Sequence, residues 1–146
     1  MKHYEKDGQM MSVLAAIVES SDDAIIGETL DGIIINWNQA AQRIYGYTSK
    51  EILGKPVSNL VPAELRNNLR AKIEKTRYQG KVNRFETTHL KKDGKRIDVS
   101  LTILPVTDEN GNIVGTSTIA RDITEHRRME KGLYEREEKY RVLFET

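Results

Sequence analysis

Polar and apolar residues alternate along several short segments of the chain. In residues 97–103 the order is Ile-Asp-Val-Ser-Leu-Thr-Ile, so one side of a strand would be buried and the other exposed. Three Asp-Gly or Asn-Gly dipeptides, at 31–32, 93–94 and 110–111, separate runs rich in β-branched residues, and such dipeptides favour two-residue hairpin turns. The pattern predicts five strands: Ala24–Thr29, Ile33–Trp37, Asn83–Leu90, Arg96–Val106 and Ile113–Thr124.

Helix signals lie between the second and third of these strands. Asn38 can cap a short helix over residues 39–45, and Thr-Ser-Lys-Glu at 48–51 has the spacing of a capping box. A longer helix is expected to open at Pro62 and to stop at Gly80. Its apolar stripe consists of Leu65, Leu69, Ile73 and Thr76.

Both ends of the chain are predicted to be helical. Residues 10–20 form an amphipathic helix, whose apolar side contains Met11, Leu14, Ile17 and Val18. Residues 125–146 are more than half charged, with a short seam that Arg136 interrupts. The seam residues are Met129, Leu133, Tyr140 and Leu143. We expect a homodimer that uses these two helices, and the exposed face of the predicted sheet is another candidate contact.

The order of elements predicts an α+β fold. Two strands, short helices, a long helix and three antiparallel strands indicate a five-stranded antiparallel sheet with helices packed on one face. N- and C-terminal helices flank this core. We divide the chain into a tail and entry helix at 1–20, a core domain at 21–125, and a charged linker helix at 126–146.

The composition excludes several classes of protein. The 146 residues include no cysteine, so disulfides, thiolate metal sites and thiol catalysis are excluded. The longest apolar run, residues 14–18, is far shorter than the roughly 20 residues that span a bilayer. No export signal opens the chain. We therefore expect no membrane contact from these residues, and a cytoplasmic location.

Positive charge is concentrated in one segment. Residues 64–96 contain 11 basic and 4 acidic residues, whereas the whole chain has 23 basic and 22 acidic ones. This excess is either an anion-facing surface or a solvated face. Because aromatic residues do not interleave with the basic ones, nucleic-acid binding is not expected.

Six motifs in sequence order resemble those of PAS sensory domains. They are DGIIINWNQAA (31–41), YGY (45–47), EILGK (51–55), KDG (92–94), DENG (108–111) and RDITE (121–125). The resemblance covers about residues 12–125. It implies a sheet wrapped by helices around a central pocket, which senses a small molecule, light, oxygen or redox state and alters an attached effector.

A second resemblance concerns the parent protein. Residues 138–146 resemble the entry helix of another PAS domain and parallel residues 13–20. The chain is therefore expected to belong to a multidomain signal-transduction protein, such as a sensor histidine kinase in a two-component system, with the effector domain in the same parent chain. Phosphate-binding loops, HExxH metal sites and nucleophile elbows do not occur, so neither catalysis nor a metal site is expected here.

Flavin and haem are cofactors that the resemblance suggests. Blue-light PAS domains need a reactive cysteine. When this chain is aligned with their motif, Val57 takes the position of that cysteine. Ala120 takes the position where those domains carry a flavin-contacting glutamine. Thiol-adduct flavin chemistry is therefore excluded. Haem-binding members commonly use a histidine of the long helix; their register places Leu69 near that site, so this ligation is not expected. The cofactor stays unknown.

A ligand pocket is expected on the inner side of the sheet. Alternation and the family register place twelve residues around it: Ile26, Val57, Leu69, Ile73, Phe85, Thr87, His89, Val99, Leu101, Ile103, Thr118 and Ala120. The imidazole of His89 and the hydroxyl of Thr87 could orient a small, mainly apolar ligand. The alternatives are a hydrogen bond from His89 to a core partner or to water, and plain core packing of the aliphatic residues.

The other histidines and the end of the last strand complete the candidate residues. Nothing is expected of His3, and His126 is interpreted as a solvated linker residue rather than a phospho-acceptor. The resemblance assigns Asp122 and Thr124 to signal relay, with Asp122 anchoring the C-terminal helix. Two functions remain open: a ligand-gated sensory module that signals through this helix to a kinase or similar effector, or a ligand-free domain for dimerisation or protein interaction.

Overall fold

The structure, a computed structural model, describes residues 2–145, with side chains described for residues 8–139 and 141. The predictions for His3, Tyr140 and Leu143 therefore fall outside the described side chains. The strands are β1 (Ala24–Thr29), β2 (Ile34–Trp37), β3 (Asn83–Leu90), β4 (Arg96–Thr107) and β5 (Ile113–Asp122). The helices are α1 (Lys2–Ser20), α2 (Gln39–Tyr45), α3 (Ser49–Ile52), α4 (Arg66–Gln79) and α5 (Thr124–Glu145), with 3-10 helices η1 (Val57–Leu60) and η2 (Ala63–Leu65).

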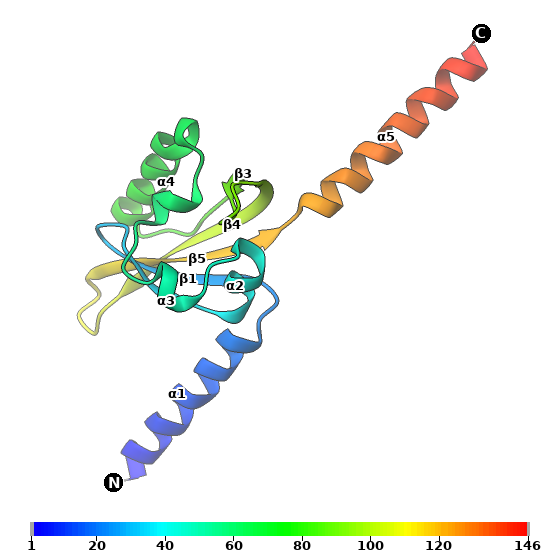
Figure 1. Cartoon of the computed structure of the whole chain (residues 1–146). Coiled ribbons are helices and arrows are strands. Elements are labelled where there is room, and N and C mark those ends of the chain that lie inside the picture. Colours follow the sequence, from blue (N-terminus) through cyan, green and yellow to red (C-terminus); the bar gives the residue numbers. More distant parts are fainter. Residues whose placement is uncertain (1, 146) are drawn as a thin grey trace.

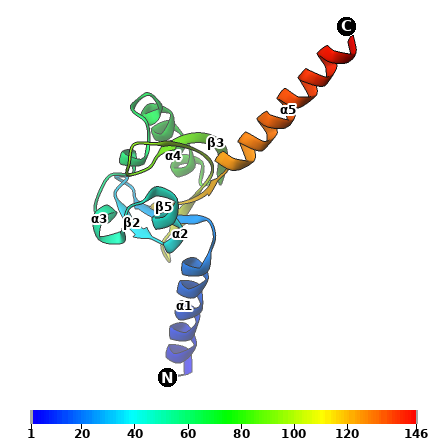
Figure 2. The same cartoon turned by 45° about the vertical axis from the view of Figure 1, so that its right-hand side comes forward.

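The five strands form one antiparallel sheet in the order β2-β1-β5-β4-β3 (Figure 1). The last strand, β5, therefore lies in the centre, between β1 and β4. Helices α2, α3 and α4 lie over the sheet, and α1 and α5 extend away from it (Figures 1 and 2). This arrangement confirms the predicted α+β class.

Three hairpins connect neighbouring strands as predicted, but their turns contain three residues instead of two. In the first, the amide of Thr29 donates to the carbonyl of Ile33, and equivalent bonds close the other two turns. In each dipeptide the glycine has a positive φ, and the preceding Asp or Asn has a negative one. A two-residue type I′ turn would need a positive φ at both residues. A type I turn followed by a left-handed glycine is the usual form of such a three-residue loop.

The inner face of the sheet is the side that the helices cover. Alternate residues of β4, namely Ile97, Val99, Leu101 and Ile103, are buried there. This confirms the side predicted from alternation. Asn38 caps α2, and the capping box of Thr48 and Glu51 begins α3, again as predicted.

Some predicted boundaries were wrong. Helix α4 begins at Arg66 instead of Pro62, because the Leu65 amide bonds to the Pro62 carbonyl and forms a 3-10 turn first. Strand β2 begins one residue late, since Ile33 forms only an isolated bridge to Pro56. Strand β4 extends to Thr107, β5 ends two residues earlier than predicted, and α1 begins well before residue 10.

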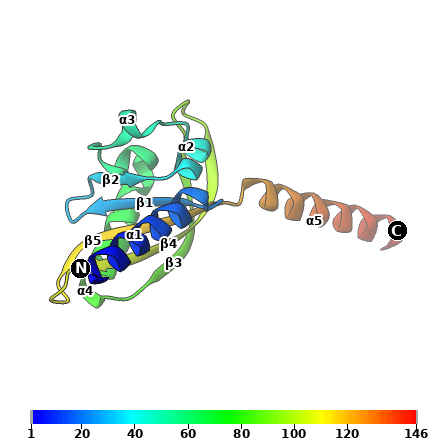
Figure 3. The same cartoon turned by 90° about the horizontal axis from the view of Figure 1, so that it is seen from below.

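The two terminal helices leave the sheet from adjacent strand ends. The start of β1 pairs with the end of β5, with Ala24 opposite Ala120. Next to this pair, Arg121 makes two hydrogen bonds to the Asp23 carboxylate, at 3.2 and 3.1 Å. Helix α1 leaves the sheet on the side opposite α4 (Figures 1 and 3). Within residues 2–145, we find no helix with the length and apolar character that a membrane crossing would need.

Candidate functional site

The predicted pocket residues occupy the inner face of the sheet and the helices above it. Ile26, Val99, Leu101, Ile103 and Ala120 are fully buried and pack in one hydrophobic core. Val57, Leu69 and Thr118 are also buried, Phe85 and Ile73 pack against the margin of this core, and Thr87 is half-buried. The predicted residues therefore lie near one another, but most of them pack against one another as hydrophobic core.

His89 has a protein partner on one side of its ring. Its Nδ1 lies 2.7 Å from the Tyr45 hydroxyl, and both side chains are buried. Burial lowers the pKa of His89 to about 4, so the imidazole is neutral at pH 7. If the Tyr45 hydroxyl donates to Nδ1, the proton of His89 lies on Nε2, which has no hydrogen-bond partner among the described residues. The core-partner alternative therefore holds for Nδ1, and Nε2 is left as a donor.

Glu28 is a buried polar residue that the sequence interpretation missed. It lies on the inner face of β1 and is 2% exposed. The Thr116 hydroxyl donates to its Oε2 at 3.0 Å, while Oε1 has no partner in the described part of the chain. Burial raises the pKa of Glu28 to about 7, although hydrogen bonds from Thr118 and Thr116 partly offset the effect. The alternation of Ala24, Ile26 and Glu28 could have indicated this inward carboxyl group.

A groove of about 430 Å³ lies between α4 and the β1–β2 turn, and we call it the α4 groove. Three of the predicted pocket residues, Val57, Leu69 and Ile73, line it. The other lining residues are Leu30, Asp31, Gly32, Pro56, Ser58, Arg66, Arg70, Glu74 and Arg77. Its volume is within the range of small-molecule sites. Here three aliphatic residues of the predicted pocket meet a charged rim, which includes three arginines of the basic segment 64–96.

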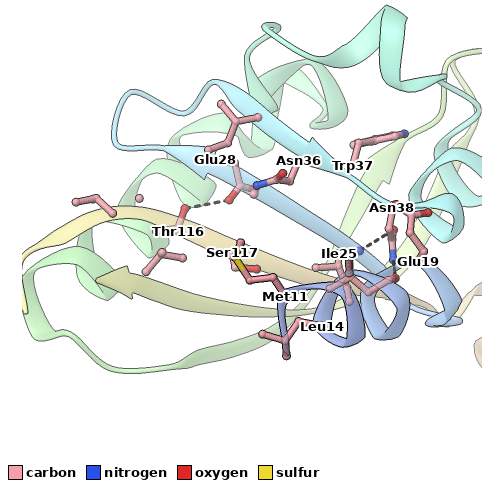
Figure 4. A pocket seen from close by; sticks show the side chains of 17 residues that line it. Met11, Leu14, Glu19, Ile25, Glu28, Asn36, Trp37, Asn38, Thr116 and Ser117 are labelled. Atoms are coloured by element: carbon pink, nitrogen blue, oxygen red, sulfur yellow. Dashed lines mark hydrogen bonds between the residues drawn. The ribbon is translucent and has the colours of Figure 1, made fainter. Parts of the chain in front are cut away.

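A second hollow, of about 520 Å³, lies on the other side of the sheet. Figure 4 shows Met11 and Leu14 of α1 on one side of it, and Ile25 and Ser117 of the sheet on the other. Apolar residues of α1 stay exposed here, with Leu14 at 53% and Met11 at 72% exposure. The amphipathic pattern of residues 10–20 predicted this apolar helix side, but not the hollow.

The junction between β5 and α5 is held by hydrogen bonds. A carboxylate oxygen of Asp122 accepts from the Thr124 amide at 3.0 Å. The Thr124 hydroxyl oxygen accepts from the Asp98 amide at 2.9 Å. Arg127, one turn further along α5, pairs with Glu86 of β3 and lies 3.4 Å from the Asp98 carboxylate. The two predicted relay residues thus lie on either side of the junction, Asp122 at the end of β5 and Thr124 at the start of α5. Asp98, Glu86 and Arg127 make additional contacts there that the sequence did not indicate.

The remaining candidates lie on the surface. His126 is exposed on α5, and its Nε2 is 2.9 Å from the Glu130 carboxylate. Met129 and Leu133, the two seam residues with described side chains, are 61% and 60% exposed. No group of three metal-binding side chains occurs among the described residues.

Fold and site together define a small α+β sensory domain, with one sheet, one helical cover and helices leaving from β1 and β5. The chain belongs to the PAS domain family, whose model matches residues 22–125. It is similar to the PAS domain of a protein from Colwellia psychrerythraea, with 29% identity and a TM-score of 0.75 over 80% of this chain and 98% of that one.

Two further similarities are more distant. The fold resembles that of an RNA-binding light-oxygen-voltage receptor, with 19% identity and a TM-score of 0.76 over 88% of this chain and 37% of that one. Phytochrome C of Arabidopsis thaliana is 22% identical over 119 residues, which cover 79% of this chain. The chain spans 11% of the length of that relative.

Proposed function

We propose that this domain is the sensory module of a longer signalling protein, in which a small ligand changes the packing of β5 and so the position of α5. The observation that carries the proposal is the path of β5. This strand contributes Thr116, Thr118 and Ala120 to the inner face, and only Ile123 separates its end from α5. A change at the inner face therefore has a short covalent route to the outgoing helix.

The junction described above supports this route. Because Asp122, Thr124 and Asp98 share hydrogen bonds, a displacement of β4 or β5 would alter the contacts that hold the first turn of α5. Two arrangements of such a junction would give two positions of the helix, which is the basis of many molecular switches. The proposed effector is a kinase or similar domain in the parent chain, in the cytoplasm.

Similarity to light receptors bears on the nature of the cue. A flavin that forms a thiol adduct would need a cysteine, and the chain has none. The α4 groove, of about 430 Å³ with three aliphatic side chains on its floor, has the size of a small-molecule site. We therefore propose a small-molecule cue.

Ligand content and helix position can be measured on the same protein. Mass spectrometry after denaturation, with a visible absorption spectrum, identifies any molecule that copurifies. Because the chain lacks cysteine, Lys50→Cys on α3 and Glu135→Cys on α5 permit specific spin labelling. We expect the distance distribution between the labels to change when the copurified molecule is removed. An unchanged distribution after complete removal would contradict the relay.

A ligand-free dimerisation element is the second candidate, and the exposed residues of α1 favour it. Val13 and Ile17 of α1 are 54% and 58% exposed, and Ile35 and Val114 on the outer face of the sheet are 53% and 49% exposed. Exposed apolar clusters of this kind mark interaction sites. A preparation without any bound molecule that forms a stable homodimer would support this candidate over the first.

A further inference from the structure

The α4 groove combines an aliphatic floor with a basic rim. Its floor consists of Val57 and Leu69, each at least nine-tenths buried, and the half-buried Ile73. The opposite wall is held by backbone hydrogen bonds, with the Val57 amide donating to the Gly32 carbonyl at 2.8 Å. The floor and wall are thus formed before any ligand arrives, which lowers the cost of binding.

Guanidinium groups line one side of this groove. Arg66 and Arg70 lie one turn apart on α4, and Arg77 lies about two turns further along. The helix contains five basic residues and a single acidic one, Glu74, and its first turn has no acidic residue. Arg66 donates to the Val61 carbonyl at 3.4 Å, whereas Arg70 and Arg77 form no ion pair within the described residues. Their positive field is therefore available to an anion.

Two carboxylates also lie on the rim, Asp31 in the hairpin turn and Glu74 on α4. They reduce the positive charge without cancelling it, because three guanidinium groups face two carboxylates. The balance favours a monoanion over a dianion. Arginine binds carboxylates through two parallel hydrogen bonds, and an aliphatic floor favours an alkyl chain over a polar ring.

We propose that the α4 groove binds a single-chain aliphatic carboxylate. Its alkyl chain lies on Val57, Leu69 and Ile73, and its carboxylate is held by Arg70 with Arg66 or Arg77. This inference rests on the proposed function, because it identifies the α4 groove as the site at which the domain senses its ligand. It assigns the polar contact to α4, whereas the sequence placed it at His89 and Thr87.

Calorimetric titration of the whole protein with three probes that each carry a ten-carbon alkyl chain tests the chemistry of the ligand. Decanoate is used below its micellar concentration, beside decan-1-ol and decyltrimethylammonium. We expect decanoate to bind at least about tenfold more tightly than either, as charge-assisted hydrogen bonds imply. Binding should tighten by up to roughly fourfold per methylene from hexanoate to decanoate. Equal binding of decanol, or no binding of decanoate, would overturn the proposal.

Charge-neutral variants locate the site. Arg70→Gln and Arg77→Gln should each weaken decanoate binding by about fivefold or more, and Glu74→Gln should strengthen it. Arg84→Gln, which removes the same charge from the exposed face of β3 outside the groove, is the matched control and should leave binding unchanged. Methyl resonances of Val57, Leu69 and Ile73 should shift during the titration. Equal weakening in the control would show that only the general charge of the chain matters and would overturn the proposal.

Two further outcomes separate this inference from the proposed function. Binding of decanoate without a change in the distance between the labels on α3 and α5 would contradict the relay and leave the ligand class intact. Failure of monomeric decanoate to bind, together with binding to phosphatidylglycerol vesicles, would overturn the ligand class and indicate a membrane surface as the partner of α4.

Discussion

Glu28 should make the folded state less stable as the pH rises. Its pKa is about 7 in the folded state, against an ordinary value of 4.5. Between these two values the folded state keeps a proton that the unfolded state loses. The stabilisation that Glu28 gives to the folded state is therefore complete below pH 4.5 and is lost as the pH rises through 7. The shift corresponds to about 3 kcal/mol. Urea unfolding of Glu28→Gln should show no such loss.

His89 has the opposite effect over nearly the same range. Its folded pKa of about 4 is below the ordinary 6.5, so the unfolded state binds the extra proton and stability falls as the pH drops from 6.5 towards 4. In the unaltered chain, Glu28 and His89 change the free energy of unfolding in opposite directions as the pH rises, and the two effects nearly cancel between pH 4.5 and 6.5. Glu51 and Glu64, whose pKa values are lowered, act below this window.

Single variants should therefore reveal each slope. In Glu28→Gln, the free energy of unfolding should rise by roughly 1.4 kcal/mol per pH unit between 4.5 and 6.5. In His89→Gln, which keeps an acceptor for the Tyr45 hydroxyl, it should fall over the same interval. A flat profile in both variants would show that neither group is linked to folding.

The side chain of Asn38 makes four hydrogen bonds, and one of them connects α1 to the core. Its Oδ1 accepts from the amides of Ile25 and Ala41, and its Nδ2 donates to the carbonyls of Val18 and Asp23. Asn38→Ala should destabilise the domain by about 3 kcal/mol, since helix capping and buried hydrogen bonds are lost together. Asn38→Asp keeps the cap but loses both donors, so amide exchange at the end of α1 should increase while α2 stays protected.

At the scale of elements, the strands and their inward sides could be predicted, because the backbone of a strand points successive side chains to opposite faces of the sheet. The β4 residues Val99 and Leu101 are buried as expected, and each hairpin forms at its Asp-Gly or Asn-Gly pair. The start of α4 could not be predicted, because Pro62 suits the beginning of a 3-10 turn as well as that of a helix. The sequence could not show whether the inward residues form a pocket or a packed core. That outcome depends on how side chains from several elements pack together, and the alternation along one strand carries no information about it.

The β5–α5 junction carries the relay prediction. Asp122→Ala removes the oxygen that accepts from the Thr124 amide, so the first turn of α5 should loosen. Because the Asp122 side chain is exposed, we expect a change in unfolding free energy of no more than about 1 kcal/mol. In the full-length parent the variant should retain its fold and lose its signal response.

Asp108→Ala is a suitable control for this variant. Asp108 also accepts hydrogen bonds from backbone amides, those of Asn110 and Asn112, but it lies in the β4–β5 turn away from α5. Its loss should affect stability to a similar degree and leave the response intact. A normal response in Asp122→Ala would exclude this residue as the anchor of the relay.

At the scale of the whole molecule, α1 carries exposed apolar residues along one side. Met10, Val13 and Ile17 recur at helical spacing and are 54–60% exposed. Helix α1 and the outer sheet face border the same hollow, so a second copy of the chain could cover both. The sequence indicated both the helix and the exposed sheet face as candidate contacts, but the hollow between them became visible only in the fold.

We therefore expect a concentration-dependent homodimer in sedimentation velocity experiments, with a dissociation constant that the double variant Val13→Lys and Ile17→Lys raises by at least about 100-fold. Burial of two such side chains contributes roughly 3 kcal/mol or more, and a charge in their place adds a desolvation cost. Leu53→Lys changes a residue of similar exposure, 43%, at the end of α3, and should leave the dimer unchanged. Because α1 is joined to the core near Asn38, Asn38→Asp should weaken the dimer less than the double variant does. A monomer at high concentration, or equal weakening by Leu53→Lys, would contradict an interface on α1.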